Sequence, residues 1–142
     1  MESRITIITL GVKDFQKSYH FYHSGLGFQT DAKPTDQIAF FKTNGTVLAI
    51  YPIDKLADDI SPDLPKDNSG FPGITLAHNV KEKSEVHTIL EQAQRAGGKI
   101  VKPAQDAFWG GFHGYFSDPD GYFWEVAYFD QFKYDEHGNL EL

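Results

Sequence analysis

Glu125 is the first candidate for chemistry, because this single acid stands between Trp124 and Val126 in an otherwise apolar run. An unpaired carboxylate is costly to bury among large apolar side chains, so Glu125 must face either solvent or a polar pocket. Successive side chains of a strand point to opposite faces, which places Phe123 and Ala127 on the face of Glu125. In a pocket, the acid can serve as a general base or bind a hydrogen-bond donor or cation of a ligand.

His113 and Tyr115 are further candidates, because the same alternation places both side chains on one face of a strand. If that face is concave, His113, Tyr115 and Glu125 form a polar cluster in an aromatic pocket. The alternative is that His113 only satisfies a hydrogen-bond partner at a strand edge. Trp109 precedes two glycines, which let a loop move or approach closely, so its ring is either a lid over the pocket or a plug at the rim of the core.

The remaining histidines give weaker evidence of a functional role. His20 and His23 are three residues apart on a predicted helix, a spacing that can bridge a metal ion. Histidines of this kind more commonly have surface or packing roles, so we assign them no metal. His78, His87 and His137 are isolated in the sequence and receive no role.

A tight turn positions the acid. Residues 118–121 read Asp-Pro-Asp-Gly, which fits a type I turn with proline at the second position and glycine at the fourth. Aromatic and β-branched runs on both sides predict a hairpin of strands at 112–117 and 122–129.

The rest of the chain repeats one pattern of elements. The long segment 52–72 contains four prolines and several acids, which predicts a loop. The sequences Ile-Thr-Leu at 8–10 and 74–76 open two similar halves, each too small to stand alone. The predicted strands are 5–12, 27–30, 37–42 and 46–51 in the first half and 73–80 and 99–102 in the second, and the predicted helices are 14–24 and 83–96.

Composition limits the possible partners. With 142 residues, of which 40% are hydrophobic, the chain is long enough for one domain with a substantial core. The net charge of −7 argues against a nucleic-acid partner, which requires clustered lysine and arginine. The sequence has no cysteine, so disulfides and thiolate chemistry are excluded. No apolar run approaches membrane-spanning length, and we expect a cytoplasmic protein without a membrane partner.

Several short motifs follow one another in order along nearly the whole chain. They are Val-Lys-Asp-Phe at 12–15, Ser18, Phe-Tyr at 21–22, Leu-Gly-Phe at 26–28, Ala-Gly-Gly at 96–98, Asp-Pro-Asp-Gly at 118–121 and Trp-Glu-Val at 124–126. In this order and spacing, the chain resembles the vicinal oxygen chelate superfamily, which includes glyoxalase I, bleomycin-resistance and fosfomycin-resistance proteins and extradiol dioxygenases. The Trp-Gly-Gly segment at 109–111 and the tail 132–142 resemble a bacterial branch described as glyoxalase-like.

The resemblance implies an α+β fold of two βαβββ modules that form a curled sheet with a concave pocket, with the helices packed outside. The chain is then one domain, 1–142, with halves at about 1–51 and 73–130 joined by the loop 52–72. In the family, four strands each supply one metal ligand, and the matching positions here are Ile7, Ala49, Gly73 and Glu125. Three of these residues have no donor side chain, so we expect no metal and no other cofactor.

We therefore expect a glyoxalase-like protein that binds a small aromatic or apolar ligand without the family's metal. Phe41, Trp109, Tyr115 and Phe123 are expected to form the wall of the pocket, and the resemblance adds Ile7, Ala49 and Gly73. One alternative is a divalent-metal-dependent lyase, isomerase or dioxygenase of glyoxalase type. Another is a metal-free enzyme that uses Glu125 and His113 for proton transfer. We also expect a homodimer, because a small domain with many exposed aromatic residues tends to associate.

Overall fold

The protein is described here from a computed structural model, which describes residues 1, 4–61, 63–64, 66 and 70–141. The chain forms two compact units, residues 1–71 and 72–142. The boundary between them lies at the end of the segment 52–72. Within the described residues, no helix is long and apolar enough to cross a membrane.

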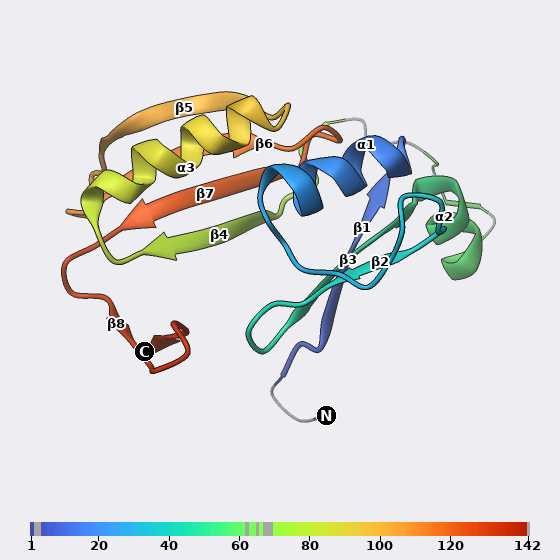
Figure 1. The fold of residues 1–142 in the computed structure, drawn as a ribbon, viewed down its shortest axis with the longest axis horizontal. Coiled ribbons are helices and arrows are strands. Elements are labelled where there is room, and N and C mark those ends of the chain that lie inside the picture. The colour runs from blue at the N-terminus through green and yellow to red at the C-terminus, as the bar shows by residue number, and fades with distance from the viewer. Residues whose placement is uncertain (2–3, 62, 65, 67–69, 142) are drawn as a thin grey trace. The chain divides into compact units, whose positions relative to one another are not determined.

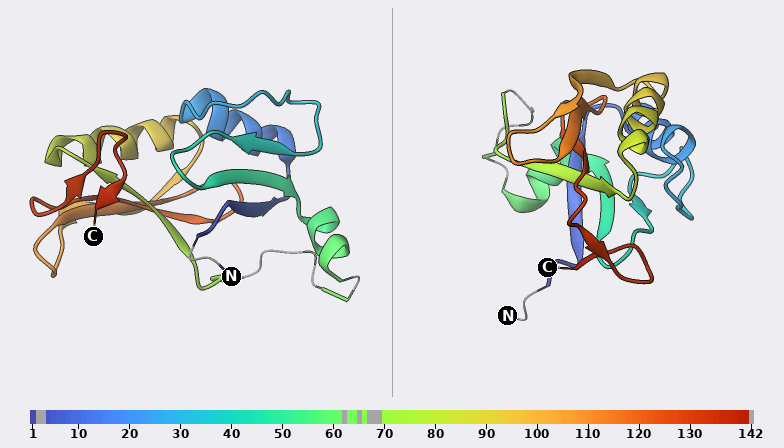
Figure 2. Two further views of the ribbon diagram at one scale, coloured as in Figure 1. Left: turned by 90° about the horizontal axis from the view of Figure 1, so that it is seen from below. Right: turned by 90° about the vertical axis from the view of Figure 1, so that its left-hand side faces the viewer.

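The first unit is built on a mixed three-stranded sheet (Figure 1). Its middle strand is β3 (Val47–Pro52), which pairs in parallel with β1 (Ile7–Val12) and antiparallel with β2 (Ala39–Phe41). One helical segment, made of α1 (Phe15–His20) and the π-helical turn η1 (Phe21–Gly25), covers one face, as Figure 2 shows. The Asp14 carboxylate caps this segment by accepting the Lys17 N–H at 3.0 Å, as the sequence predicts.

Two predictions for the first unit are wrong. Residues 27–30 do not form a strand, and this segment contributes a single antiparallel bridge between Gln29 and Lys42. The segment predicted as a loop at 52–72 begins with a helix, α2 (Ile53–Ile60), which lies at the end of β1 and β3 (Figure 2). A Cβ at Gly11 would lie 3.0 Å from Ile53 Cγ1, so α2 packs closely on β1 where a glycine makes room.

The second unit contains a four-stranded mixed sheet in the order β4-β7-β6-β5. Strand β4 (Thr75–Val80) is parallel to β7 (Phe123–Tyr128), whereas β6 (Phe112–Ser117) is antiparallel to both β7 and β5 (Lys99–Asp106). The long helix α3 (Lys83–Arg95) covers one face of this sheet (Figure 1). The buried side of α3 carries Val86, Leu90 and Ala93.

The two units share one topology, which supports the predicted repeat. In each unit, the first strand is parallel to the last strand, and a third strand pairs antiparallel with that last strand. The Gln29–Lys42 bridge occupies the place that β5 has in the second unit. The α+β class with helices outside is confirmed, but both sheets are open rather than curled. The first unit is therefore a βαββ version of the predicted module, followed by α2.

The turn at 118–121 closes the β6–β7 hairpin as predicted. The Gly121 N–H donates to the Asp118 carbonyl at 3.2 Å, and Gly121 has a φ of +94°, which a residue with a side chain rarely adopts. The Asp118 side chain accepts the N–H groups of Asp120 and Tyr122 at 2.9 and 2.8 Å. Since Asp118 is buried, these bonds satisfy an acid that would otherwise destabilise the turn.

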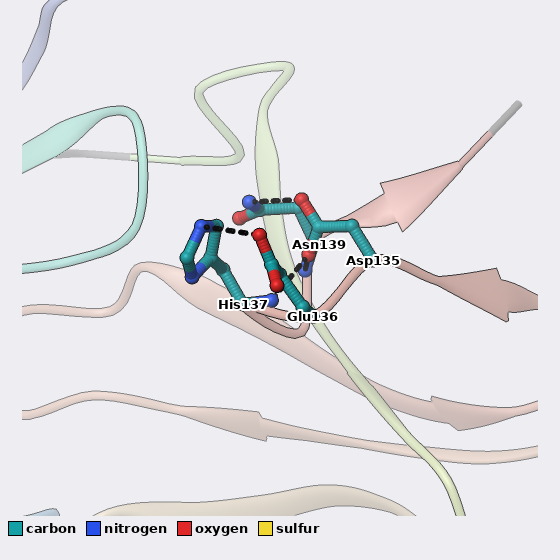
Figure 3. Close-up of polar contacts among 4 residues, drawn as sticks. All are labelled: Asp135, Glu136, His137 and Asn139. Carbon is teal, nitrogen blue, oxygen red and sulfur yellow. Dashed lines mark hydrogen bonds and ion pairs between the residues drawn. The ribbon is translucent and has the colours of Figure 1, made fainter.

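The chain ends in a small hairpin of β8 (Lys133–Tyr134) and β9 (Leu140–Glu141). In its turn, Asp135 accepts the N–H groups of His137 and Asn139 and the side-chain amide of Asn139 (Figure 3). The hydrogen bonds from Asn139 lower the pKa of Asp135, and the hydrogen bond from His137 contributes less to this shift. The Tyr134 hydroxyl donates to the Val80 carbonyl at 3.1 Å and so fastens the hairpin to the end of β4.

Gly114 generates a testable prediction. A Cβ at this position would lie 2.6 Å from Leu90 Cδ1 and 2.9 Å from the Lys102 carbonyl oxygen, so Gly114→Ala must push α3 or β5 away from β6. We expect the variant to lose about 1–3 kcal/mol of unfolding free energy, measured by urea denaturation. Val101→Ala on the exposed side of β5 is the control and should change stability by less than about 0.5 kcal/mol. Equal stability of both variants would contradict the packing described here.

Candidate functional site

The centre of the candidate site is a short hydrogen bond between His113 on β6 and Glu125 on β7. His113 Nδ1 lies 2.6 Å from Glu125 Oε1, and the two side chains are 7% and 20% exposed. Gly114 faces Leu90 of α3, so its neighbour His113 lies on the opposite face of the sheet. The acid is thus paired within the second unit, on the face that α3 does not cover.

Tyr115 lies directly opposite Glu125 in the register of β6 and β7. Burial and the hydrogen bond between its hydroxyl and Glu125 raise the pKa of Tyr115 to about 12. The phenol therefore keeps its proton and donates to the carboxylate. His113 and Tyr115 also contact each other edge to face, with ring centroids 5.5 Å apart. The structure thus brings together all three polar residues that strand alternation assigned to one face.

Trp109 packs over this cluster from the loop between β5 and β6. Its indole meets the His113 ring edge to face at 5.6 Å and the Phe129 ring at the same distance. A Cβ at Gly111 would lie 1.7 Å from the indole, so this glycine provides the space that Trp109 occupies. The loop closes by hydrogen bonds between Ala107 and Gly111 and between Gly110 and Ala107, at 2.8 and 3.0 Å.

Lys102 is a neighbour of the site that sequence reasoning missed. It pairs with Tyr115 across β5 and β6, and its Nζ lies 5.3 Å from the centroid of the Tyr115 ring. The register of β5 shifts on both sides of Lys102, and such irregularities re-aim side chains. Pro103 and the following residues gave no strand signal, so the sequence did not reveal that Lys102 stands opposite Tyr115.

The remaining predicted pocket residues lie in different settings. Phe123 is half-buried on the face of β7 that carries Glu125. Phe41 is fully buried in the first unit, where its ring contacts Tyr22 and Phe28, and it also lines a depression of about 220 Å³ beside Phe40. This makes Phe41 a core residue of its unit.

The three apolar positions of the family pattern also differ among themselves. Ile7 and Ala49 share one face of the β1–β3 pair, but Ile7 is 49% exposed whereas Ala49 is fully buried. Gly73 precedes β4 and has a φ of +73°. Ile7 is thus a half-exposed strand residue, Ala49 is packed in the core of its unit, and Gly73 has turn geometry.

The donor set does not fit a divalent ion. Among the four positions that match the family's ligands, Glu125 alone carries a donor, and its Oε1 already accepts the His113 N–H. Nowhere in the described part of the chain do three or more histidine, aspartate or glutamate residues gather as a metal site. A divalent ion in a protein needs several such ligands.

The histidine pair on the first helical segment also has local partners. His23 Nδ1 lies 2.9 Å from the Phe28 carbonyl oxygen, and the His20 and His23 rings both contact Tyr19, at 5.6 and 5.3 Å. These contacts support a packing role. In the second unit, burial lowers the pKa of His78, although the Glu85 carboxylate opposes this shift.

The fold and the sequence define the class of this protein. Residues 4–126 match the model of the Glyoxalase/Bleomycin resistance protein/Dioxygenase superfamily, and the chain belongs to that family. A similar solved structure is that of a glyoxalase-related enzyme from Fulvimarina pelagi. It is 31% identical, covers 99% of both chains and has a TM-score of 0.89.

Two further structures extend the comparison. A glyoxalase/bleomycin resistance protein/dioxygenase from Nocardioides is 26% identical over 92% of this chain and 86% of its own, with a TM-score of 0.75. A lactoylglutathione lyase from Agrobacterium tumefaciens is 20% identical over 91% of this chain and 96% of its own, with a TM-score of 0.67. At that identity, the second likeness concerns the fold alone.

The raised pKa of Tyr115 predicts how stability depends on pH. The folded state holds the phenolic proton more tightly than the unfolded chain, whose tyrosine pKa is about 10. The resulting stabilisation is present below pH 10 and is lost as the pH rises towards about 12. Tyr115→Phe should therefore lose less unfolding free energy than the unmodified protein between about pH 9 and pH 11, measured by urea denaturation.

Another tyrosine also contributes to the dependence of unfolding free energy on pH, and a third serves as the control. Burial and the Glu85 charge also raise the pKa of Tyr134, so Tyr115→Phe should reduce the slope without abolishing it. Tyr51→Phe in the first unit serves as the matched control. Identical slopes for Tyr115→Phe and the unmodified protein would show that Tyr115 does not hold its proton in this way.

Proposed function

We propose that this protein binds a small organic molecule with an aromatic or apolar body, without the family's divalent metal. The proposed site is the face of β6 and β7 that carries His113, Tyr115 and Glu125. Its ligand would lie against aromatic rings and make a few polar contacts, as small molecules commonly do in proteins.

The observation that carries this proposal is the paired acid. The Glu125 carboxylate is 20% exposed and lies next to a nearly buried histidine, on a sheet face that no helix of the same unit covers. Burial of such polar groups costs free energy of folding. Two apolar residues would pack more simply there. Polar groups held in fixed positions among aromatic rings are instead typical of recognition sites.

The aromatic surroundings support an apolar or aromatic ligand. Trp109 and Tyr115 both meet the His113 ring edge to face, at 5.6 and 5.5 Å. Phe123 extends the same face two residues before Glu125. Rings of this kind offer large contact areas at low entropic cost.

A metal-free enzyme is the second candidate, and the 2.6 Å His113–Glu125 contact favours it. An imidazole oriented by a carboxylate is a common arrangement for proton transfer. Turnover of a bound compound, lost on substitution of His113, would distinguish this function from binding alone. A divalent-metal-dependent lyase, isomerase or dioxygenase of glyoxalase type is disfavoured by the donor set described above.

Substitution of Glu125 tests the proposal. A panel of small aromatic and apolar compounds is screened by thermal shift, with and without prior chelation. A ligand at 100 times its Kd should stabilise the protein by about 2.7 kcal/mol, and chelation should leave this shift unchanged. Glu125→Gln keeps the volume but removes the charge that pairs with His113, so it should weaken binding by about tenfold, the effect of one lost or misplaced hydrogen bond in the site.

Two comparisons complete this test. Glu91→Gln on the exposed face of α3 is the matched control and should bind like the unmodified protein, since Glu91 is 69% exposed beside Arg95. Elemental analysis of the purified protein is expected to find less than one equivalent of nickel, zinc or manganese. One equivalent of metal, together with glyoxalase-type activity that a chelator abolishes, would refute the proposed function.

We also propose that the protein is a cytoplasmic homodimer. Ile7 and Phe40 lie on one face of the sheet of the first unit and are 49% and 46% exposed, and Ile5 nearby is 65% exposed. Exposed apolar side chains of this kind favour association. Light scattering should give about twice the chain mass of 16.0 kDa, and a monomer mass at high protein concentration would contradict the dimer.

A further inference from the structure

The His113–Glu125 hydrogen bond fixes which nitrogen of the imidazole carries a proton. An ionised carboxylate only accepts hydrogen bonds, so the 2.6 Å contact with Glu125 Oε1 requires an N–H at His113 Nδ1. In the neutral imidazole, the other nitrogen, Nε2, then carries a lone pair and is an acceptor. Glu125 therefore determines the hydrogen-bonding character of an atom that it does not touch.

His113 Nε2 is not fully buried, although the side chain as a whole has low exposure. It makes no hydrogen bond to any residue that the structure describes. Over the same residues, every fully buried side-chain nitrogen or oxygen has a hydrogen-bond partner. Since Nε2 has none, it is not fully buried.

The orientation of the imidazole is fixed by its neighbours. Trp109 and Tyr115 meet the His113 ring at interplanar angles of 88° and 72°. With Nδ1 bound to Glu125, the ring cannot turn without losing these contacts. A donor that approaches Nε2 thus meets an acceptor already in position, which avoids the cost of ordering it on binding.

The Glu125 carboxylate is a weaker candidate for direct contact with a ligand. It accepts hydrogen bonds from His113 and from Tyr115, which lies directly opposite it. A ligand donor at Glu125 would share a carboxylate that already accepts two hydrogen bonds. His113 Nε2, by contrast, accepts no hydrogen bond from any residue that the structure describes.

We propose that His113 Nε2 is the atom through which this site selects its ligand, and that the ligand is a neutral aromatic molecule with a hydroxyl or N–H donor on its ring. Glu125 is then a positioning residue that holds Nε2 in its acceptor form. This inference rests on the proposed function, because it assumes that an aromatic ligand binds at this face. It adds a requirement for a donor, which binding of an apolar body alone does not need.

Phenol and toluene provide the test, because they share size and shape but only phenol has a donor. Binding to the full-length protein is followed by NMR titration at millimolar concentrations. We expect phenol to bind about tenfold more tightly than toluene, the effect of one hydrogen bond. In His113→Phe this preference should disappear, whereas His137→Phe in the β8–β9 turn, where the side chain is 69% exposed, should retain it.

A measurement on the free protein tests the tautomer independently. Long-range ¹⁵N–¹H NMR spectra of the histidines should show the proton of neutral His113 on Nδ1. In Glu125→Gln, the amide can donate as well as accept, so a substantial fraction of His113 should shift to the Nε2–H form and the preference for phenol should fall. Glu91→Gln should leave the His113 signals unchanged.

The outcomes separate this inference from the proposed function. Equal binding of phenol and toluene, or a proton on Nε2 in the unmodified protein, would overturn the role of Nε2 while leaving an aromatic site in place. Loss of the phenol preference in His137→Phe would likewise contradict it. If neither phenol, toluene nor any compound of the wider panel binds, the proposed function and this inference both fail.

Discussion

The register between β6 and β7 is the constraint on which the candidate site depends. The Asp118 N–H donates to the Tyr122 carbonyl, and the Asp118 carboxylate accepts two further N–H groups, so the hairpin closes in one alignment. That alignment sets Tyr115 opposite Glu125. A slip of one residue would turn the Glu125 side chain towards α3 and its apolar residues, where an unpaired acid is costly. The turn therefore fixes the positions of the polar side chains of the site as well as the pairing of the two strands.

The sequence revealed the elements that depend on local signals. Asp14, the 118–121 turn and the apolar stripe of α3 each act within a few residues, and all three are found where expected. Helix α2 was missed although Ile53, Ala57 and Ile60 repeat at helical spacing, because the prolines and acids of the segment 52–72 favoured a loop. The prediction of a strand at 27–30 was wrong for a different reason. Its residues suit a strand, but apart from the bridge to Lys42 they do not pair.

The sequence predicted which polar side chains share one face of the sheet, but not which of them form hydrogen bonds with one another. Alternation along β6 and β7 grouped His113, Tyr115 and Glu125, because the period of a strand is fixed by backbone geometry. The direct partner of Glu125 is Tyr115, and His113 reaches the carboxylate diagonally from its pairing with Ala127. Such a diagonal contact depends on rotamers and twist. The position of Lys102 depends on the bulges of β5, which no local pattern announced.

The two tryptophans of this chain occupy contrasting environments, and this has a practical consequence for spectroscopy. Trp109 packs against His113 in the loop above the candidate site, whereas Trp124 is stacked on Phe116, with the two rings 3° from parallel, on the opposite face of the sheet. Trp109 is thus an intrinsic fluorescent reporter beside the imidazole, and Trp124 supplies an internal reference from the core. Replacement of either residue by phenylalanine separates their emission, so occupancy of the face and integrity of the fold can be followed in one sample without a label.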